Sequence, residues 1–459
     1  MNRREFGKVA ALASSSLGLS MLSSCATPHS DVDCIEPFMV SEDLSKEMYE
    51  KALSITEEKV RGGDDEQFFK KPFIDAAFSK NIFLWDTCFM ACFAKYHMDE
   101  LPVYQALDNF YEQAEPDGFI CREYRQDGRP LWPKNHPVSI NPPLLAFAEL
   151  EIYTVSKDVD RLKKVYPILK RNFGFLVERY QGEDRLFFGD ALGMGMDNIP
   201  RSPRDWTPTQ GSGLTEDELW SKIGALNLPA EEQLDRFVSE YKDTRTGVWN
   251  EQGRFIDLSA QMAMYALQLI RIAELTGNDA DIAAYKSFHK DLKEAINQKC
   301  WSIEDGFYYD LGFGKQIKRR HIGAYWTLLG GVVPVERRER FLEKLKDPAE
   351  FYRETPLPCL SATDEDYKGW GDYWLGGVWA PTSYMVFKGL SAVGEHDLAK
   401  KLAGITYQNV AKVYKGTGTF WENYSPDLVS YGLPSRRDFC GWTALFPIAV
   451  YREYVGVEV

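Results

Sequence analysis

Histidine and cysteine are scarce in this chain of 459 residues, which holds six histidines and eight cysteines. Neither an HExxH pair nor a CxxC pair occurs, so the sequence predicts no metal site. Apart from Cys25, the cysteines form an odd set at irregular spacing, which does not indicate a disulfide framework. Basic residues are outnumbered by acidic ones, and the net charge of −14 argues against nucleic acid as a partner.

Apolar and aromatic residues are plentiful. Apolar residues make up 44% of the chain and charged residues 27%, which excludes wholesale disorder and permits a large core. The aromatic residues comprise 12 Trp, 24 Tyr and 27 Phe. Most of them must lie in the core, but a surplus of Trp and Tyr also suits a site that stacks on the flat apolar faces of sugars.

The first 24 residues have the pattern of an export signal. Residues 3–8, Arg-Arg-Glu-Phe-Gly-Lys, resemble a twin-arginine signal, and the apolar, serine-rich stretch that follows is too short to span a bilayer. Leu-Ser-Ser-Cys at 22–25 resembles a bacterial lipobox, with Cys25 as the lipidated first residue of the mature chain. The alternative is an ordinary cleaved signal with an incidental cysteine.

These features predict a signal peptide over residues 1–24 and an N-terminal tether over 25–43. No later apolar run is long enough to cross a membrane, so we expect contact with the membrane only through the lipid anchor. The predicted location is the bacterial cell envelope, on the periplasmic side or attached to the outer membrane.

Helical periodicity dominates the rest of the chain, and the helices are of two kinds. Six are apolar nearly all round, which is typical of buried helices, and six have charged faces, which is typical of helices that lie outside them. The expected apolar helices are 85–96, 141–154, 257–275, 321–331, 380–391 and 440–454. The expected amphipathic helices are 44–60, 101–114, 160–180, 280–299, 336–346 and 396–414.

The connections alternate in length with the helices. After each apolar helix the chain turns within about five residues, and before each one it runs for about twenty residues or more. The six long connections, in order, are 61–84, 115–140, 181–256, 300–320, 347–379 and 415–439. Six outer–inner hairpins with all long loops at one end describe an all-α fold, an (α/α)6 barrel over residues 44–459. A superhelical repeat array is the rival, but no motif recurs at a fixed period. Long loops in a compact domain are usually functional, so we expect the site at the long-loop face.

The third long loop contains a capping box, Thr-Glu-Asp-Glu at 215–218. This box predicts a helical insert that extends to about residue 242 and acts as a lid.

Two acidic residues in the long loops are candidate catalytic groups. Asp197 follows Gly193 and Gly195, and glycines let the backbone approach a ligand closely. An ion pair between Asp197 and Arg201 is the structural alternative. Glu422 lies among aromatic residues that can desolvate it and raise its pKa.

Other candidates stand where inner helices are expected to begin. Trp85 and Asp86 open the first of these helices, and Trp374 and Trp379 precede the fifth. Asn141 precedes two prolines, which predicts that it caps the second inner helix. For the tryptophans, packing at the mouth of the barrel is the alternative to a role in binding.

At this point the motifs resemble a family. Four segments look like the ordered signatures of glycoside hydrolase family 63, which trehalases and mannosylglycerate hydrolases partly share. The segments are Leu-Trp-Asp-Thr at 84–87, Gly-Met-Asp-Asn-Ile-Pro-Arg at 195–201, Tyr-Trp-Leu-Gly-Gly-Val-Trp-Ala-Pro at 373–381 and Glu-Asn-Tyr-Ser-Pro at 422–426. The resemblance extends from about residue 80 to the C-terminus and also implies an (α/α)6 barrel.

The resemblance implies an inverting α-glycosidase, with Asp197 as the general acid and Glu422 as the general base. It implies hydrolysis of α-linked, most simply α-glucosidic, bonds from the non-reducing end of oligosaccharides, without a metal or other cofactor. The implied substrate-binding residues are Trp85, Asp86, Asn141, Arg201, Trp374 and Trp379.

The chain departs from the family at one motif. The family commonly has Trp-Arg-Gly-Pro-x-Trp where this chain has Leu375 and Gly377 in place of Arg and Pro. Loss of the arginine removes a cationic donor and affects the expected sugar specificity more than the chemistry. A trehalase-like or α-mannosyl-glycoside hydrolase therefore stays open, and an unsaturated-uronyl hydrolase is less favoured. A non-catalytic surface lipoprotein that binds glycans is the alternative outside enzymes.

Overall fold

The computed structural model describes residues 40–456, apart from 64–67, 77–79, 135, 202–215, 230–231, 238, 240–252 and 440. The expected signal peptide, Cys25 and nearly all of the tether therefore lie outside the described residues. Among the described residues, no helix is both long and apolar enough to traverse a bilayer.

The helices expected to be apolar all round form an inner ring. Every residue of α3 is buried, as are 16 of the 21 residues of α10. The inner elements are α3 (Leu84–Ala94), α5 (Leu145–Ser156), α10 (Ile256–Thr276), η3 (Ile322–Tyr325) with α12 (Trp326–Leu329), α14 (Ala380–Ala392), and η4 (Thr443–Leu445) with η5 (Phe446–Val455). Each contacts the next, and η4 and η5 return to contact α3, which closes the ring.

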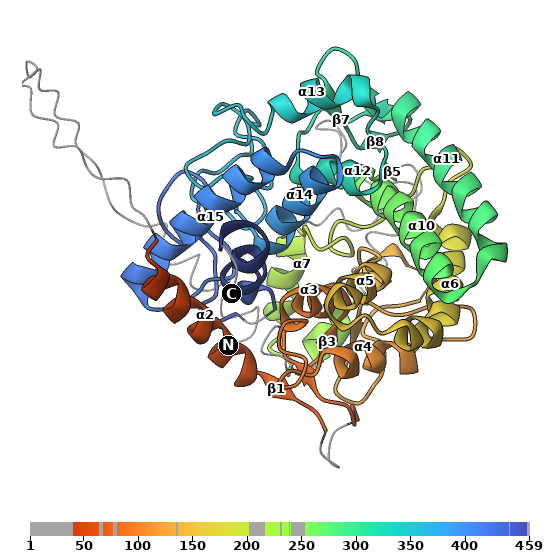
Figure 1. The fold of residues 1–459 in the computed structure, drawn as a ribbon, viewed down its shortest axis with the longest axis horizontal. Coiled ribbons are helices and arrows are strands. Elements are labelled where there is room, and N and C mark those ends of the chain that lie inside the picture. Colours follow the sequence, from red (N-terminus) through yellow and green to blue (C-terminus); the bar gives the residue numbers. More distant parts are fainter. Residues whose placement is uncertain are drawn as a thin grey trace, which may run out of the picture.

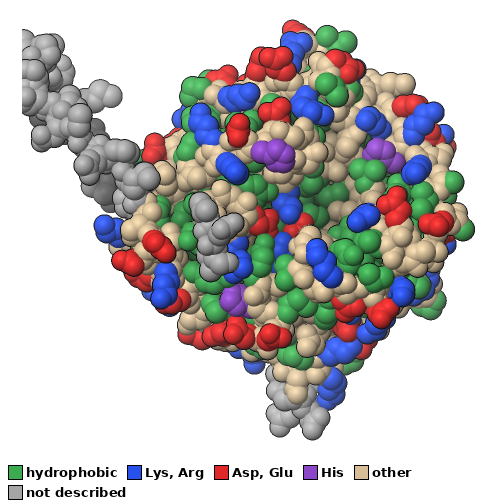
Figure 2. Space-filling view, viewed as in Figure 1, with side chains coloured by type: hydrophobic (Ala, Val, Ile, Leu, Met, Phe, Trp, Pro, Cys, Tyr) green, Lys and Arg blue, Asp and Glu red, His purple; other side chains and the backbone are tan. Residues whose placement is uncertain are grey.

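The amphipathic helices surround this ring (Figure 1). The outer helices are α2 (Glu42–Glu57), α4 (Val103–Glu112), α6 (Val159–Tyr180), α11 (Ile282–Lys299), α13 (Val335–Glu343) and α15 (His396–Thr417). Ser41 and Asp158 cap α2 and α6 by accepting a backbone N–H, and Gly277 ends α10 in the left-handed conformation. The fold is an (α/α)6 barrel, as the two kinds of helix predict. Figure 2 shows acidic and basic side chains interspersed over one face of the molecule.

The long connections hold the described strands, which are two residues each. They are β1 (Val60–Arg61), β2 (Phe73–Ile74), β3 (Ile82–Phe83), β4 (Glu123–Tyr124), β5 (Gly253–Arg254), β6 (Trp301–Ser302), β7 (Phe307–Tyr308), β8 (Leu311–Gly312) and β9 (Lys315–Gln316). One antiparallel pair matters for the site, because Phe83 of β3 lies opposite Glu123 of β4. This pair places the second long connection beside the start of α3. The 3₁₀ turns η1 (Pro137–Ser139) and η2 (Asp279–Asp281) complete the connections.

The third long connection contains α7 (Glu216–Gly224), which begins at the second residue of the predicted capping box. Thr215 itself lies outside the described residues. A helix is therefore present where the box predicts one, and the lid role stays a prediction.

The predicted cap at Asn141 is wrong. Helix α5 begins at Leu145, and residues 141–144 carry no helical assignment. Asn141 and Pro142 each precede a proline, and a residue before proline is disfavoured in the helical region. The helix therefore starts only after both prolines, and the side chain of Asn141 is left available for contacts between loops.

The ring is closed at its short-turn end by a buried ionic network. Lys95, directly after α3, lies 2.6 Å from Glu151 of α5 and 2.9 Å from Glu453 of η5. Lys388 of α14 lies 2.8 Å from Glu151 and 3.4 Å from Glu453. Burial alone would lower the pKa of Lys95, but the two carboxylates outweigh it and raise that pKa above its usual range. The network thus joins four inner elements.

Candidate active site

A narrow pocket of about 40 Å³ lies at the long-connection end of the barrel. That space holds more than one water molecule. Among the described residues, its lining comes from the first, second, third, fifth and sixth long connections and from the first turn of α3. The lining residues are Phe83, Trp85, Asp86, Arg122, Glu123, Asn141, Gly195, Asp197, Tyr373, Trp374, Glu422, Arg436, Phe439 and Trp442. Both candidate carboxylates therefore face one cavity although 225 positions separate them in the sequence.

The loop that carries Asp197 is held by a turn at Asp190 and by its close approach to Trp85. Asp190 accepts hydrogen bonds from the backbone N–H groups of Leu192 and Gly193, which tightens the turn before it. Gly195 has φ +78°, and a Cβ there would lie 2.5 Å from the indole of Trp85. Glycine is required at 195 by both the backbone conformation and this close approach. The approach brings half-buried Asp197 beside the wall formed by Trp85.

Tyr373 contacts the candidate acid directly. Its hydroxyl donates a hydrogen bond to Oδ2 of Asp197 over 3.0 Å. Asp372 and Tyr373 both have positive φ, which is strained for residues with a Cβ. Asn198 holds this turn, since its amide donates to the carbonyl of Asp372 and its oxygen accepts from the N–H of Trp374. The residue after the acid thus fixes the loop that orients the acid.

Glu422 lies in a backbone clamp. Its N–H donates to the carbonyl of Arg436 over 2.8 Å, and its side-chain Oε2 accepts the N–H of Arg436 over 3.2 Å. The indole of Trp442 donates to the carbonyl of Glu422. The side chain is nine-tenths buried. These contacts fix the carboxylate in one orientation at the pocket wall.

Four tryptophans form a continuous cluster at this wall. The ring centroids of Trp85 lie 6.1 Å from Trp374 and 5.7 Å from Trp442, and Trp374 stacks flat on Trp379 at 4.0 Å. Trp85, Trp374 and Trp442 line the pocket, but Trp379 is not among its described lining residues. The expectation that Trp379 lines the pocket is corrected, because its ring is covered by that of Trp374.

Arg201 is also displaced from its expected role. Its guanidinium pairs with Asp257 at the start of α10 and with Asp310, 3.2 Å away, which also contacts His321. Among the described residues, Arg201 is not part of the pocket lining, and its ion pairs do not include Asp197. Arg201 instead anchors the end of the loop that carries Asp197, because its guanidinium is held by two buried carboxylates.

Asn141 and Asp86 lie in the pocket wall as expected. Asn141 accepts the backbone N–H of Trp85 over 3.4 Å and donates to the carbonyl of Gly193 over 2.7 Å. It therefore connects the first, second and third long connections. Asp86, in the first turn of α3, is buried beside Gly441.

Three charged residues of the wall were not singled out from the sequence. Arg122 is buried against the ring of Trp132, 4.4 Å from its centroid, and donates to the carbonyl of Leu192. Its Nε has no hydrogen-bond partner, and no carboxylate pairs with it among the described residues. Glu123 accepts hydrogen bonds from the side chains of Trp132 and Asn81. The backbone of Arg436 exchanges two hydrogen bonds with Glu422, as described above. The pairing of β3 with β4, which the sequence does not reveal, is what places Arg122 in the pocket.

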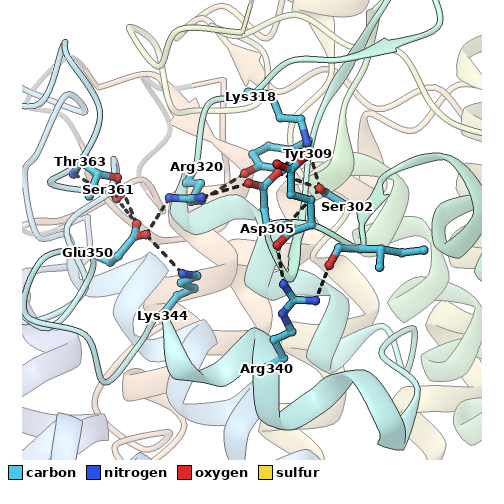
Figure 3. A network of polar contacts seen from close by, with 12 residues as sticks. Ser302, Asp305, Tyr309, Lys318, Arg320, Arg340, Lys344, Glu350, Ser361 and Thr363 are labelled. Carbon is cyan, nitrogen blue, oxygen red and sulfur yellow. Dashed lines mark hydrogen bonds and ion pairs between the residues drawn. The ribbon is translucent and has the colours of Figure 1, made fainter.

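A larger cavity of about 450 Å³ lies between the fourth and fifth long connections, where Figure 3 shows a network of polar contacts. Its cations are already paired: Lys318 with Asp305 at 2.6 Å, and Arg320 with Glu350 at 2.6 Å. An anionic ligand there would compete with these carboxylates for the two cations. Among the residues that the structure describes, no group of acidic, His and Cys side chains is arranged to hold a metal ion. The narrow pocket is therefore the better candidate for chemistry.

Comparison of the sequence with protein families finds one matching model. The model of the mannosylglycerate hydrolase MGH1-like glycoside hydrolase domain matches residues 79–437. An uncharacterized protein of Borreliella burgdorferi is 23% identical over 395 residues, covering 83% of this chain and 71% of that protein. Mannosyl-oligosaccharide glucosidase of Saccharomyces cerevisiae is 25% identical over 216 residues, which cover 41% of this chain and only 25% of the glucosidase.

Solved structures share the fold at low sequence identity. The GH63 mannosylglycerate hydrolase of Thermus thermophilus, solved with glucose, superposes with a TM-score of 0.66 at 18% identity, covering 87% of this chain and 99% of that one. The neutral trehalase of Saccharomyces cerevisiae gives a TM-score of 0.61 at 17% identity, with 83% and 73% covered. Both similarities concern the barrel as a whole.

Proposed function

Because the chain belongs to the family of mannosylglycerate hydrolase MGH1-like glycoside hydrolases, within glycoside hydrolase family 63, we propose how this hydrolase acts. We propose that it cleaves α-glycosidic bonds, most simply α-glucosidic ones, at the non-reducing end of oligosaccharides with inversion. Asp197 donates a proton to the leaving oxygen. Glu422 removes a proton from the water that attacks the opposite face of the anomeric carbon.

The observation that carries this proposal is the convergence of Asp197 and Glu422 on one pocket from separate loops. An inverting pair leaves room for a water between base and sugar, with carboxyl groups about 6.5–9.5 Å apart. The two side chains are also supported differently. Tyr373 holds one oxygen of Asp197, and the backbone N–H of Arg436 holds one oxygen of Glu422.

The remaining wall supports recognition of one sugar. Asp86 and Asn141 offer hydrogen-bonding groups for hydroxyls, and Trp85 and Trp374 offer apolar ring surface. Arg122 provides a buried guanidinium in a chain that lacks the arginine common at position 375. We assign to Arg122 the contact with sugar oxygens that the family arginine would otherwise make.

The stereochemical test is proton NMR of the first product released from an α-linked substrate. Inversion gives the β anomer before mutarotation. Initial release of the α anomer means retention and removes the water-activating role from Glu422. The substrate itself is sought with a panel of α-linked disaccharides that includes trehalose and α-mannosyl glycosides, since those alternatives use the same two carboxylates.

The roles of the two acids are separated with a glycosyl fluoride of the preferred sugar. Fluoride needs little acid assistance, so D197N should hydrolyse it much better than E422Q does, while both variants lose about 10²–10⁴ in turnover of the natural bond. E304Q, in the other cavity, is the matched control and should stay active. The opposite ranking on fluoride exchanges acid and base. Loss of turnover with retained sugar binding in D197N also separates the enzyme from a glycan-binding lipoprotein.

We also propose that the protein is exported and lipidated at Cys25, on the strength of the twin-arginine and lipobox patterns. Labelled palmitate should be incorporated into the wild-type protein and not into C25A. Equal labelling of both, or of neither, contradicts the assignment. This test is independent of the catalytic one.

A further inference from the structure

An exposed apolar patch lies on two loops next to the pocket. Ten large hydrophobic side chains are exposed among the described residues, and four of them belong to these loops. They are Trp370, Leu428, Val429 and Leu433, which are 48%, 56%, 44% and 55% exposed. The other six are scattered along the chain, where single exposed hydrophobic residues need no explanation.

Backbone hydrogen bonds hold the two loops together. The N–H of Leu433 donates to the carbonyl of Trp370 over 3.0 Å, and the N–H of Asp427 donates to the carbonyl of Gly369 over 3.2 Å. The hydroxyl of Ser425 donates to the same carbonyl of Gly369. Asp427 is in turn held by Arg353 and Tyr367. These hydrogen bonds fix the backbone of the two loops, so the loops lose little conformational freedom when a ligand packs on the patch.

Both loops lead from the patch to the active-site pocket. Trp370 precedes the pocket residue Tyr373 by three positions, and Leu433 precedes the pocket residue Arg436 by three positions. Three residues of extended chain span at most about 11 Å. Tyr373 is also the residue whose hydroxyl contacts Asp197. Arg436 in turn contacts the base Glu422. The patch therefore lies near residues that contact both carboxylates, at the rim where the part of an oligosaccharide outside the narrow pocket would extend.

We propose that Trp370, flanked by Leu433, is a stacking platform for a sugar unit of the leaving group. This inference rests on the proposed function and adds a binding subsite beyond the scissile bond. The occupant is a pyranose, because the indole offers an apolar face that matches the C–H face of a sugar ring. A second copy of the chain is the competing occupant of an exposed apolar patch.

The test compares substrates with and without a sugar leaving group. For W370A and L433S, KM for the longest oligosaccharide that the wild type hydrolyses should rise, by about tenfold in W370A. The kcat value should stay within about twofold of wild type. Kinetics on the glycosyl fluoride, which carries no leaving sugar, should be unchanged. F313A removes an equally exposed aromatic ring from the fourth long connection and should behave as wild type on all substrates.

Each other outcome overturns the platform. Equal losses on the fluoride and on the oligosaccharide mean that W370A disturbs the pocket itself. Unchanged kinetics in W370A with an active wild type refute the platform alone, whereas an inactive wild type refutes the proposed function as well. Sedimentation equilibrium tests the competing occupant. If the wild type is a dimer, W370A is a monomer and KM is unchanged, the patch serves self-association.

Discussion

Single atoms decide how the candidate acid is placed. The missing Cβ of Gly195 lets the loop lie against the edge of Trp85, and the phenol of Tyr373 selects which oxygen of Asp197 accepts a hydrogen bond. When Asp197 is protonated, an accepted bond at Oδ2 directs the proton to Oδ1. Small changes at these positions should therefore alter catalysis more than stability.

Replacement of Gly195 by alanine is expected to disturb both backbone and packing. At φ +78° an alanine costs about 1–2 kcal/mol, and its Cβ also meets the ring of Trp85 at 2.5 Å. Because a displacement of about 1 Å can cost 10²-fold in rate, kcat should fall by about that factor. G277A has nearly the same φ, +76°, but nothing within 4 Å of the new Cβ, so it should lose stability and keep its kcat. Equal kcat values in the two variants, from steady-state assays, contradict the contact.

Removal of the Tyr373 hydroxyl should move one limb of the pH–rate profile. A donor to a carboxylate favours its ionised form, so Y373F should hold the proton on the acid to higher pH. The alkaline limb of kcat/KM is then expected to shift upward, with a lower plateau because the acid is less well oriented. The limbs belong to the coupled pair of carboxylates. An unchanged profile with a lower plateau would leave Tyr373 a purely structural role.

At the scale of elements, the strands in the long connections matter more than their length suggests. The two-residue pair of β3 and β4 aligns Arg122 and Glu123 with the start of α3. In the fourth connection, β6 and β7 pair around a turn at Asp305, which Lys318, Ser302 and Arg320 contact (Figure 3). Burial alone would raise the pKa of Asp305, but the hydrogen bonds and cations outweigh it and lower this pKa to about 2.

This depressed pKa makes the fourth connection sensitive to acid. The unfolded chain has an aspartate pKa of about 3.9, so Asp305 contributes stability above about pH 4 that is lost as pH falls toward 2. D305N and K318M should both lower the free energy of unfolding at pH 6, and the difference between D305N and wild type should shrink as pH falls. K315M, on β9 of the same connection, is the control. Urea unfolding at several pH values measures this, and a difference that is independent of pH refutes the assignment.

The whole barrel depends on closure of its inner ring. Lys95 is 2% exposed and pairs with carboxylates from two other inner elements, so four of the six inner elements meet in one buried network. The network lies at the end of the ring opposite the pocket. Its loss should therefore affect the stability of the ring and leave the chemistry intact.

K95M is expected to destabilise the fold by about 3–5 kcal/mol, because removing one partner leaves buried charge unpaired. Urea denaturation measures the loss. K46M breaks an exposed pair on α2, with side chains 76% and 67% exposed, and should cost about 0.5 kcal/mol or less. The kcat of folded K95M should equal that of wild type. A cost no larger than that of K46M means that the network does not hold the ring closed.

By itself the sequence determined the two kinds of helix, the alternation of short and long connections and hence the barrel, because hydrophobic periodicity is a local property. Its four ordered motifs also singled out Asp197 and Glu422 as candidates. Tertiary structure alone decided what surrounds them. Loop packing moved Arg201 into an ion cluster, covered Trp379 and brought Arg122 to the pocket wall. The partners of Arg201 lie 56 and 109 positions away, and β3 pairs with β4 across about 40 positions, so no local pattern records which partner these side chains will meet.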